Sequence, residues 1–337
     1  MRILLLMHNY LVPPEDVSDV NLATVIWKTE YDVLSTLRDM GHEVYPLGVS
    51  NDLGVIKRAV MKWKPKIAFN LLEGFDEIGS FDQNLVAYLE LLRLPYTGCN
   101  PRGLLLARDK ALSKKLMAYH RIPVPDFVVF HRGRSTHIPR GFTFPMIVKS
   151  LTQDASIGIS QASVVKSAEK LLERVTFIHR TIGTDAIAEN YIAGRELYVG
   201  VLGNDRLKVL PVWELAFSKM PRNVHRIATD RVKWRVKYQK KHGVMTDAAK
   251  NLPRGMGLKL QHLAKRVYQV LELSGYARID FRLDEFGRVA VLEANPNPQI
   301  AYGEDFAESA EYAGLSYEAL LQRLLNLGLR WKPDKSG

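Results

Sequence analysis

Four polar residues interrupt two apolar segments near the end of the chain. In the stretch ARIDFRLDEFGRVAVLEANPNPQ, Arg278 and Asp280 precede a glycine turn, and Glu293 and Asn295 follow it. If the segments pair as antiparallel strands, Asp280 lies opposite Glu293 and Arg278 opposite Asn295, all on one face. Opposed carboxylates repel each other, and a hard cation between them removes the repulsion. The pattern therefore predicts a Mg²⁺ site, and a surface hairpin with acids paired to arginines is the alternative.

A second group of residues has the chemistry needed to hold a nucleotide. Lys149 stands in the otherwise apolar segment FPMIVKSL, and the small polar loop after it contains Ser156. A strand-borne lysine and backbone N–H groups can both contact phosphates. Glu189 and Glu196 flank a glycine turn, where they could accept hydrogen bonds from an amine or from ribose hydroxyls. From spacing alone, ordinary turns and exposed strand-end acids are the favoured explanation of the Ser156 loop and of Glu189 and Glu196.

The positive charge of the chain is concentrated in one segment. The formal net charge is +11, and residues 219–241 carry nine basic residues against the single acid Asp230. The nine are Lys219, Arg222, Arg226, Arg231, Lys233, Arg235, Lys237, Lys240 and Lys241. Such a cluster favours one anionic site over a broad nucleic-acid-binding face, and a solvated charged surface is the alternative.

The composition is that of an ordinary globular protein. The chain of 337 residues is long enough for two or three domains, and no apolar run reaches the roughly 20 residues that span a bilayer. The start, MRILLLMHNY, predicts a buried strand rather than a signal peptide. Cys99 is the single cysteine, which excludes an internal disulfide and predicts a reducing, cytoplasmic location with no membrane partner.

Hydrophobic periodicity predicts the elements that position these residues. The first hundred residues alternate strands with helices, which indicates a parallel α/β sheet covered on both faces. We expect strands there at 2–8, 42–49 and 66–74, and helices at 21–40, 52–63 and 81–92. Further strands are expected at 126–131, 144–151, 159–165, 186–192, 195–203 and 206–215, before the polar hairpin. Further helices are expected at 108–120, 167–179, 256–274 and 316–329.

Five ordered motifs resemble those of the ATP-grasp superfamily. They are PYTGCNPRGLLLARDKALSKKLMAYHRIPVP, PMIVKS with DASIGIS, AENYIAGRELYVGVLG, the polar hairpin, and AGLSYEALLQRLL. Within the superfamily, the chain is similar to the D-alanine–D-alanine ligases from about Ile67 to Leu329. The resemblance implies a three-domain fold with ATP between the second and third domains. These would be a Rossmann-like α/β domain (1–103), a central lid domain (104–189) and a C-terminal α+β catalytic domain (190–337).

The resemblance also implies a role for each matched residue. Lys110 and Lys149 would contact ATP phosphates, with Ser156 in the phosphate loop. Glu189 and the Ile192 backbone would meet adenine, and Glu196 the ribose. Two Mg²⁺ ions, or Mn²⁺ instead, would bind Asp280, Glu293 and Asn295. Arg278 would stabilise developing negative charge, and Lys237 would belong to a mobile loop that closes over the γ-phosphate.

The activity implied by the resemblance is ATP-dependent amide formation through an acyl phosphate, with release of ADP and phosphate. The acceptor side departs from the family pattern. Glu73 replaces a histidine, and Gln299 replaces a glycine after Pro298. Both are candidate substrate contacts, and we expect an amino acid or peptide substrate other than two D-alanines. The basic segment favours an anionic substrate.

Three alternatives remain open at this stage. The chain could be a genuine D-alanine–D-alanine ligase, a non-catalytic nucleotide- or polyanion-binding protein, or a kinase that stops after phosphoryl transfer. Relatives in the family usually dimerise through the first domain, so the resemblance also implies a homodimer.

Overall fold

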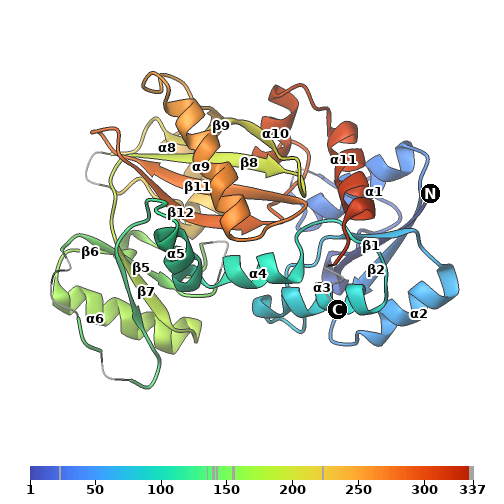
Figure 1. Cartoon of the computed structure of the whole chain (residues 1–337), viewed down its shortest axis with the longest axis horizontal. Helices are drawn as coiled ribbons and strands as arrows, with labels where there is room; N and C mark the ends of the chain where they lie inside the picture. Colours follow the sequence, from blue (N-terminus) through green and yellow to red (C-terminus); the bar gives the residue numbers. More distant parts are fainter. Residues whose placement is uncertain are drawn as a thin grey trace.

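Three β-sheets, each from a continuous part of the chain, make up the computed structural model of the protein (Figure 1). The structure describes residues 1–22, 24–134, 136–138, 141, 143–153, 156–221 and 224–333. The N-terminal sheet is blue in Figure 1, the central sheet green, and the C-terminal sheet yellow to orange. The mixed α/β architecture expected from the sequence is confirmed.

The N-terminal sheet is parallel, with strand order β2-β1-β3. Its strands are β1 (Arg2–His8), β2 (Glu43–Val49) and β3 (Ile67–Asn70). Side chains alternate along β1, so Leu4 and Leu6 face a core shared with α2 (Gly54–Trp63) and α3 (Asp82–Leu91). Helices cover both faces, as the alternating pattern predicts.

The first helix, α1 (Lys28–Asp39), is shorter than the predicted 21–40. Thr24 donates its backbone N–H to the Asn21 carbonyl in a turn, and Ile26 is 74% exposed. Among the described residues of the segment 21–27, none is buried, and burial of an apolar face is what stabilises most helices in proteins.

The central sheet has strand order β4-β7-β5-β6 and is antiparallel. Its strands are β4 (Phe127–Phe130), β5 (Met146–Ser150), β6 (Val164–Val165) and β7 (Ala186–Asn190). Helix α6 (Ala168–Phe177) packs on one face. The strand predicted at 159–165 is reduced to two residues, because Ser160 and Ser163 cap each other in a short 3₁₀ turn, Gln161–Ser163.

The C-terminal sheet is antiparallel, with strand order β10-β9-β8-β11-β12. Its strands are β8 (Arg195–Leu202), β9 (Lys208–Phe217), β10 (Val244–Ala248), β11 (Tyr276–Leu283) and β12 (Val289–Pro296). The associated helices are α7 (Asp230–Trp234), α8 (Val236–His242), α9 (Met256–Val270) and α10 (Asp305–Tyr312). The basic segment thus forms α7 and most of α8, and β10 follows shortly after it. None of these three elements was predicted from the sequence.

Two helices connect the N-terminal and central sheets. These are α4 (Pro101–Arg108) and α5 (Lys110–Tyr119). The single helix predicted at 108–120 is confirmed as α5, and α4 was missed. Asn100 caps α4 by accepting from the Gly103 N–H, and Asp109 caps α5 by accepting from Ala111 and Leu112. The separate cap at Asp109 divides one apolar stretch into two helices.

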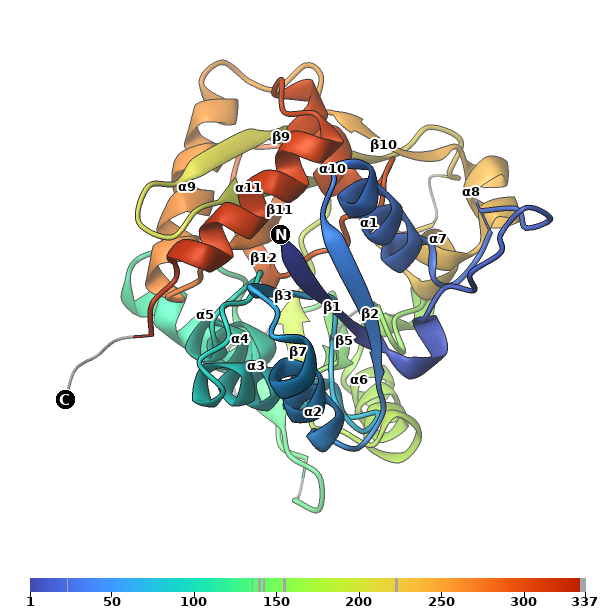
Figure 2. The same cartoon turned by 90° about the vertical axis from the view of Figure 1, so that its right-hand side faces the viewer.

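The last helix, α11 (Tyr317–Arg330), returns to the N-terminal sheet, and Figure 2 shows it beside α1. Leu320 and Leu324 share a core with Ile3, Leu5 and Phe69. The two ends of the chain therefore complete one core. Among the described residues, none of the helices combines the length and apolar character needed to cross a membrane.

Candidate active site

The polar hairpin forms as β11 and β12, and Asp280 lies opposite Glu293 with Arg278 opposite Asn295, as predicted. Nearer the turn the register differs from regular pairing: continued from Asp280–Glu293, it predicts Val291 opposite Arg282, but Arg282 lies opposite Ala290. A β-bulge between Asp280 and Phe281 shifts the pairing by one residue. Leu292 is therefore the extra residue on β12.

Asp280 accepts hydrogen bonds from two other members of the quartet. Arg278 donates from Nε and Nη2 to its two oxygens at 2.8 and 2.9 Å, and Asn295 Nδ2 donates at 3.0 Å. Arg278 also lies over the Tyr198 ring, 4.4 Å from its centroid, and 3.8 Å from Asp305. Burial raises the pKa of Asp280 to about 6, although Arg278 opposes the shift.

Glu293 has the opposite electrostatic environment. Partial burial by itself would raise its pKa, but Lys110, Lys149 and Lys233 outweigh burial and hold the pKa at about 2. Glu293 is thus ionised at neutral pH beside a carboxyl group that titrates much higher. Lys110 Nζ lies 3.9 Å from Glu293 Oε2 and donates to the Gln153 carbonyl at 2.8 Å.

The donor set fits Mg²⁺ only in part. Asp280, Glu293 and Asn295 supply oxygen atoms, which this hard cation prefers. Within the described residues, no three His, Cys, Asp or Glu side chains are grouped closely enough to hold a metal ion by themselves. An ion here would therefore complete its coordination with the Asn295 amide oxygen, water and phosphate oxygens.

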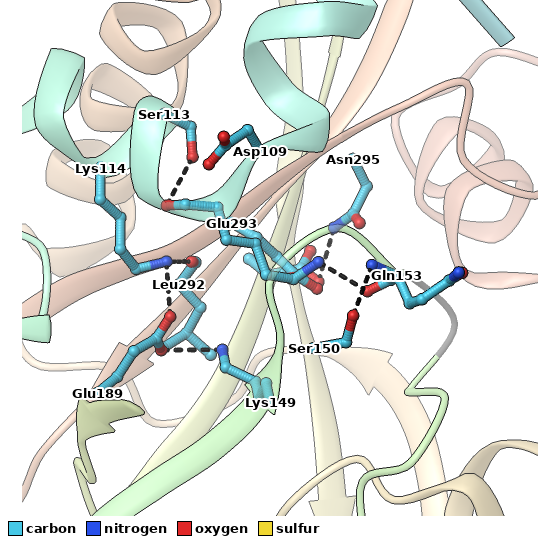
Figure 3. Close-up of polar contacts among 12 residues, drawn as sticks. Asp109, Ser113, Lys114, Lys149, Ser150, Gln153, Glu189, Leu292, Glu293 and Asn295 are labelled. Carbon is cyan, nitrogen blue, oxygen red and sulfur yellow. Dashed lines mark hydrogen bonds and ion pairs between the residues drawn. The ribbon is translucent and has the colours of Figure 1, made fainter. Parts of the chain in front are cut away.

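Glu189 lies between two lysines on the central side of the site (Figure 3). Lys114 Nζ is 3.0 Å from Oε1, and Lys149 Nζ is 2.8 Å from Oε2. Glu189 and Lys114 are both 0% exposed. Burial would raise the pKa of Glu189, but the two ammonium groups prevail and lower it. The predicted adenine contact therefore already carries two ion pairs.

Glu196 is held by two residues that the sequence analysis did not assign to the site. Arg282 Nη2 donates to its Oε2 at 2.6 Å, and Tyr198 donates to its Oε1 at 2.9 Å. Arg282 also donates to the Gly194 and Arg226 carbonyls. Arg282 thus joins the glycine turn, the start of the basic segment and the predicted ribose contact.

A cavity of about 740 Å³, counted out to its open mouth, lies between the central and C-terminal sheets. Of the predicted site residues, it brings together Lys110, Lys149, Ser156, Glu189, Ile192, Glu196, Asp280 and Glu293. Other residues that line it are Ile147, Gln153, Ile159, Asn190, Tyr191, Tyr198, Ile227, Ala228, Lys233, Arg282 and Leu292. Arg278 and Asn295 do not line it, but they contact Asp280 directly.

The remaining predicted residues lie away from this cavity. Lys237 is exposed on α8, whereas Lys233 on α7 lines the cavity. Glu73 is exposed after β3, and Gln299 Nε2 donates to Thr29 Oγ1 at 3.3 Å. Lys237 was matched to the family through the stretch RVKYQ, and the same three letters RVK also end at Lys233, so the sequence by itself does not separate the two lysines.

Comparison with known proteins identifies the family. A family model described as the D-alanine–D-alanine ligase C-terminus matches residues 116–326. The chain belongs to the D-alanine–D-alanine ligase family. It is 30% identical over 299 residues to a D-alanine–D-alanine ligase of Desulforudis audaxviator, with 88% of this chain and 90% of that one covered. It is also 30% identical over 309 residues to an uncharacterized protein, y4sG, of Sinorhizobium fredii, with 88% and 86% covered.

A solved structure shows the same fold. The D-alanine–D-alanine ligase from Bacillus anthracis, complexed with ATP, aligns with a TM-score of 0.76 over 98% of both chains at 22% identity. Membership in the family makes this chain an ATP-dependent carbon–nitrogen ligase of the ATP-grasp type. Enzymes of the family use ATP and Mg²⁺, which agrees with the predicted cofactors, while the number of ions stays a prediction.

Proposed function

We propose that this family member joins the carboxylate of one amino acid or peptide to the amine of another through an acyl phosphate, and that its substrate pair is not two D-alanines. The observation that carries the ligase assignment is the cavity that gathers Lys110, Lys149, Asp280 and Glu293 from different elements. Two lysines beside two carboxylates suit the binding of a phosphate chain together with a cation.

The proposed roles follow from the contacts. Lys110 and Lys149 neutralise charge on the phosphates, because their ammonium groups reach the cavity from α5 and β5. Glu196 accepts from the ribose hydroxyls in an orientation fixed by Arg282 and Tyr198. The Ile192 backbone and Glu189 lie at the adenine end, and the Ser156 loop covers the phosphates. Each of these assignments is part of the proposal.

The Mg²⁺ site is proposed from the oxygen ligands that these residues offer. Asp280, Glu293 and Asn295 would hold Mg²⁺, which when bound supplies positive charge to neutralise the transferred phosphoryl group. Arg278 is fixed by Asp280 and by the Tyr198 ring, so it can stabilise negative charge on the reacting acyl group without reorganising.

The loop after β12, which carries Gln299, supports a substrate other than two D-alanines. Gln299, where the family pattern has glycine, is tied to the first turn of α1 through Thr29. Lys28 in the same turn donates to the Tyr302 carbonyl, and Tyr302 donates its N–H to Asp32. The loop after β12 is thus fastened to α1 by residues of this chain, and we propose that these contacts border the acceptor site.

The charge of the basic segment supports an anionic substrate. Seven of its exposed cations make no ion pair within the part of the chain that the structure describes. They are Lys219, Arg226, Arg231, Arg235, Lys237, Lys240 and Lys241. Arg222 lies outside the described residues. Unpaired cations beside the cavity can raise the local concentration of an anionic substrate.

A genuine D-alanine–D-alanine ligase is the second candidate. It is favoured by the 30% identity to the Desulforudis audaxviator ligase over 90% of that protein. A cytoplasmic location, a homodimer, and division into domains at 1–103, 104–189 and 190–337 remain part of the proposal.

The experiment that tests the function is ATP turnover with Mg²⁺, screened against pools of amino acids and short peptides, with mass analysis of the products. We expect ADP release and a new amide with a substrate pair other than two D-alanines. Rapid turnover with D-alanine alone establishes the second candidate. Phosphorylated product without an amide indicates a kinase, and no turnover with any pool contradicts the ligase proposal.

Charge reversal tests the anionic preference once the substrate is identified. Lys240→Glu/Lys241→Glu should raise KM for the acceptor several-fold and leave KM for ATP unchanged, because these exposed side chains lie outside the cavity. Lys57→Glu/Lys62→Glu on α2 is the matched control, with both lysines also exposed. Equal acceptor KM values in the two double variants would remove the basic segment from substrate recognition.

A further inference from the structure

We propose that Lys114 is a positioning residue that fastens the central sheet to the C-terminal hairpin and thereby sets the geometry of nucleotide binding. The inference rests on the proposed assignment of the cavity between these sheets to ATP. Lys114 does not line that cavity. It acts through Glu189 on β7 and through the Leu292 carbonyl on β12 (Figure 3).

The burial of Lys114 requires specific partners. The residue is 0% exposed in the middle of α5, and a buried ammonium group is costly unless it is paired and hydrogen-bonded. Lys114 Nζ is 3.0 Å from Glu189 Oε1 and donates to the Leu292 carbonyl at 2.5 Å. One charged group thus contacts strands of two different sheets.

The β-bulge explains why the Leu292 carbonyl is available. Leu292 is the extra residue on β12, with no residue of β11 opposite it. The bulge lies immediately before Glu293 in the sequence. Lys114 therefore holds the backbone next to a proposed metal ligand, and its contact with the Leu292 carbonyl gives the bulge a role at the site.

Glu189 is the second point of attachment. Lys149 occupies one of its oxygens and Lys114 the other. Without Lys114, Oε1 of the fully buried Glu189 carboxylate would lose its charged partner. The carboxylate, then held only by Lys149, would be free to rotate about its terminal C–C bond. Lys110 and Lys114 are four residues apart and face the same side of α5, so this helix places one lysine at the cavity and the other behind it.

If the Lys114–Glu189 pair served stability alone, Lys114 would not need to contact strands of two sheets. Buried ion pairs often contribute little net stability compared with well-packed apolar residues. Replacing Lys114 with methionine leaves Glu189 paired with Lys149, so the charge remains compensated. We therefore expect the variant to fold and its defect to lie in nucleotide binding.

The test uses calorimetry to measure how tightly the whole chain binds ATP and a non-hydrolysable ATP analogue. Binding alone is measured, so no acceptor is needed. Lys114→Met should raise the Kd for both by about tenfold. Lys115→Met is the control, because Lys115 is the exposed neighbour on the same helix and should bind as the wild type does. If Lys114→Met does not fold by circular dichroism, Lys114→Gln, which keeps a donor but no charge, replaces it with the same expected direction.

A double-mutant cycle separates positioning from general stability. If Lys114 acts through Glu189, then Glu189→Gln should weaken ATP binding less in the Lys114→Met background than in the wild type. Additive effects, or a folded Lys114→Met with a Kd within twofold of the wild type, overturn the inference. Absence of ATP binding by the wild type would instead overturn the proposed function.

Discussion

Glu30 shows how strongly one side chain can depend on its surroundings. It lies in the first turn of α1 and is 5% exposed. Burial, with a smaller contribution from the nearby Glu73 and Asp32 carboxylates, raises its pKa to about 7. The fold thus disfavours the ionised form, which is the form that predominates in the unfolded chain at neutral pH.

Glu30→Gln should therefore stabilise the protein at high pH. Because the pKa is raised in the folded state, stability falls as pH rises from about 4.5 to about 7 and stays low above that. The penalty removed at pH 8 is up to about 3 kcal/mol, at roughly 1.4 kcal/mol for each pH unit by which the pKa is displaced. Urea unfolding at pH 5 and pH 8 measures it.

The control for this prediction is Glu43→Gln, at an exposed position at the start of β2. It should change the free energy of unfolding by less than about 0.5 kcal/mol at either pH. Equal effects of Glu30→Gln at pH 5 and pH 8 would contradict a raised pKa for Glu30 in the folded chain.

At the scale of elements, helices α7 and α8 decide which basic residue reaches the site. Lys233 on α7 lines the cavity and helps to lower the pKa of Glu293, whereas Lys237 on α8 is exposed. The two lysines are only four residues apart, and both occur in an RVK sequence. The chain turns at Arg235, between the two helices, and this separates them.

Lys233→Ala should lower kcat for ADP formation by about 10²- to 10³-fold, because a preorganised positive charge near the phosphates is lost. Lys237→Ala should change kcat by less than about threefold. Coupled-enzyme detection of ADP compares the two variants directly. The reverse order of effects would restore Lys237 to the role that the family resemblance implies and would mean that α7 and α8 rearrange when the nucleotide binds.

At the scale of the whole molecule, the last helix is part of the first sheet. Helix α11 packs Leu320 and Leu324 against β1 and β3, and Gly328 lies so close to Tyr96 that an added Cβ would be 2.2 Å from its carbonyl oxygen. Residues 1–103 therefore lack part of the core that covers their own sheet, although they contain all three of its strands.

Leu324→Ala should destabilise the chain by about 2–5 kcal/mol, because it removes a side chain that is 1% exposed from the shared core. Leu258→Ala, at an exposed position on α9, should cost far less. Denaturant unfolding followed by circular dichroism measures both. Similar costs for the two substitutions would mean that α11 contributes little to the core of the N-terminal sheet.

Much of the fold could be predicted from patterns in the sequence. Alternating strands and helices predicted the parallel N-terminal sheet, because a strand buried on both faces and a one-sided helix have different hydrophobic periods. The pairing of Asp280 with Glu293 followed from a glycine turn and the two-residue period of a strand. Helix α4 and strand β10 were missed, because caps and neighbouring strands rather than a clear periodicity define them.

The sequence by itself determined the residue types of the site and their order along the chain, because spacing within one strand or helix is a local property. Tertiary structure alone decided which of them meet. The β-bulge at Leu292, the two lysines on Glu189, and the choice of Lys233 over Lys237 all depend on contacts between segments far apart in sequence. Such contacts are set by packing of whole sheets and helices, which a local pattern does not contain.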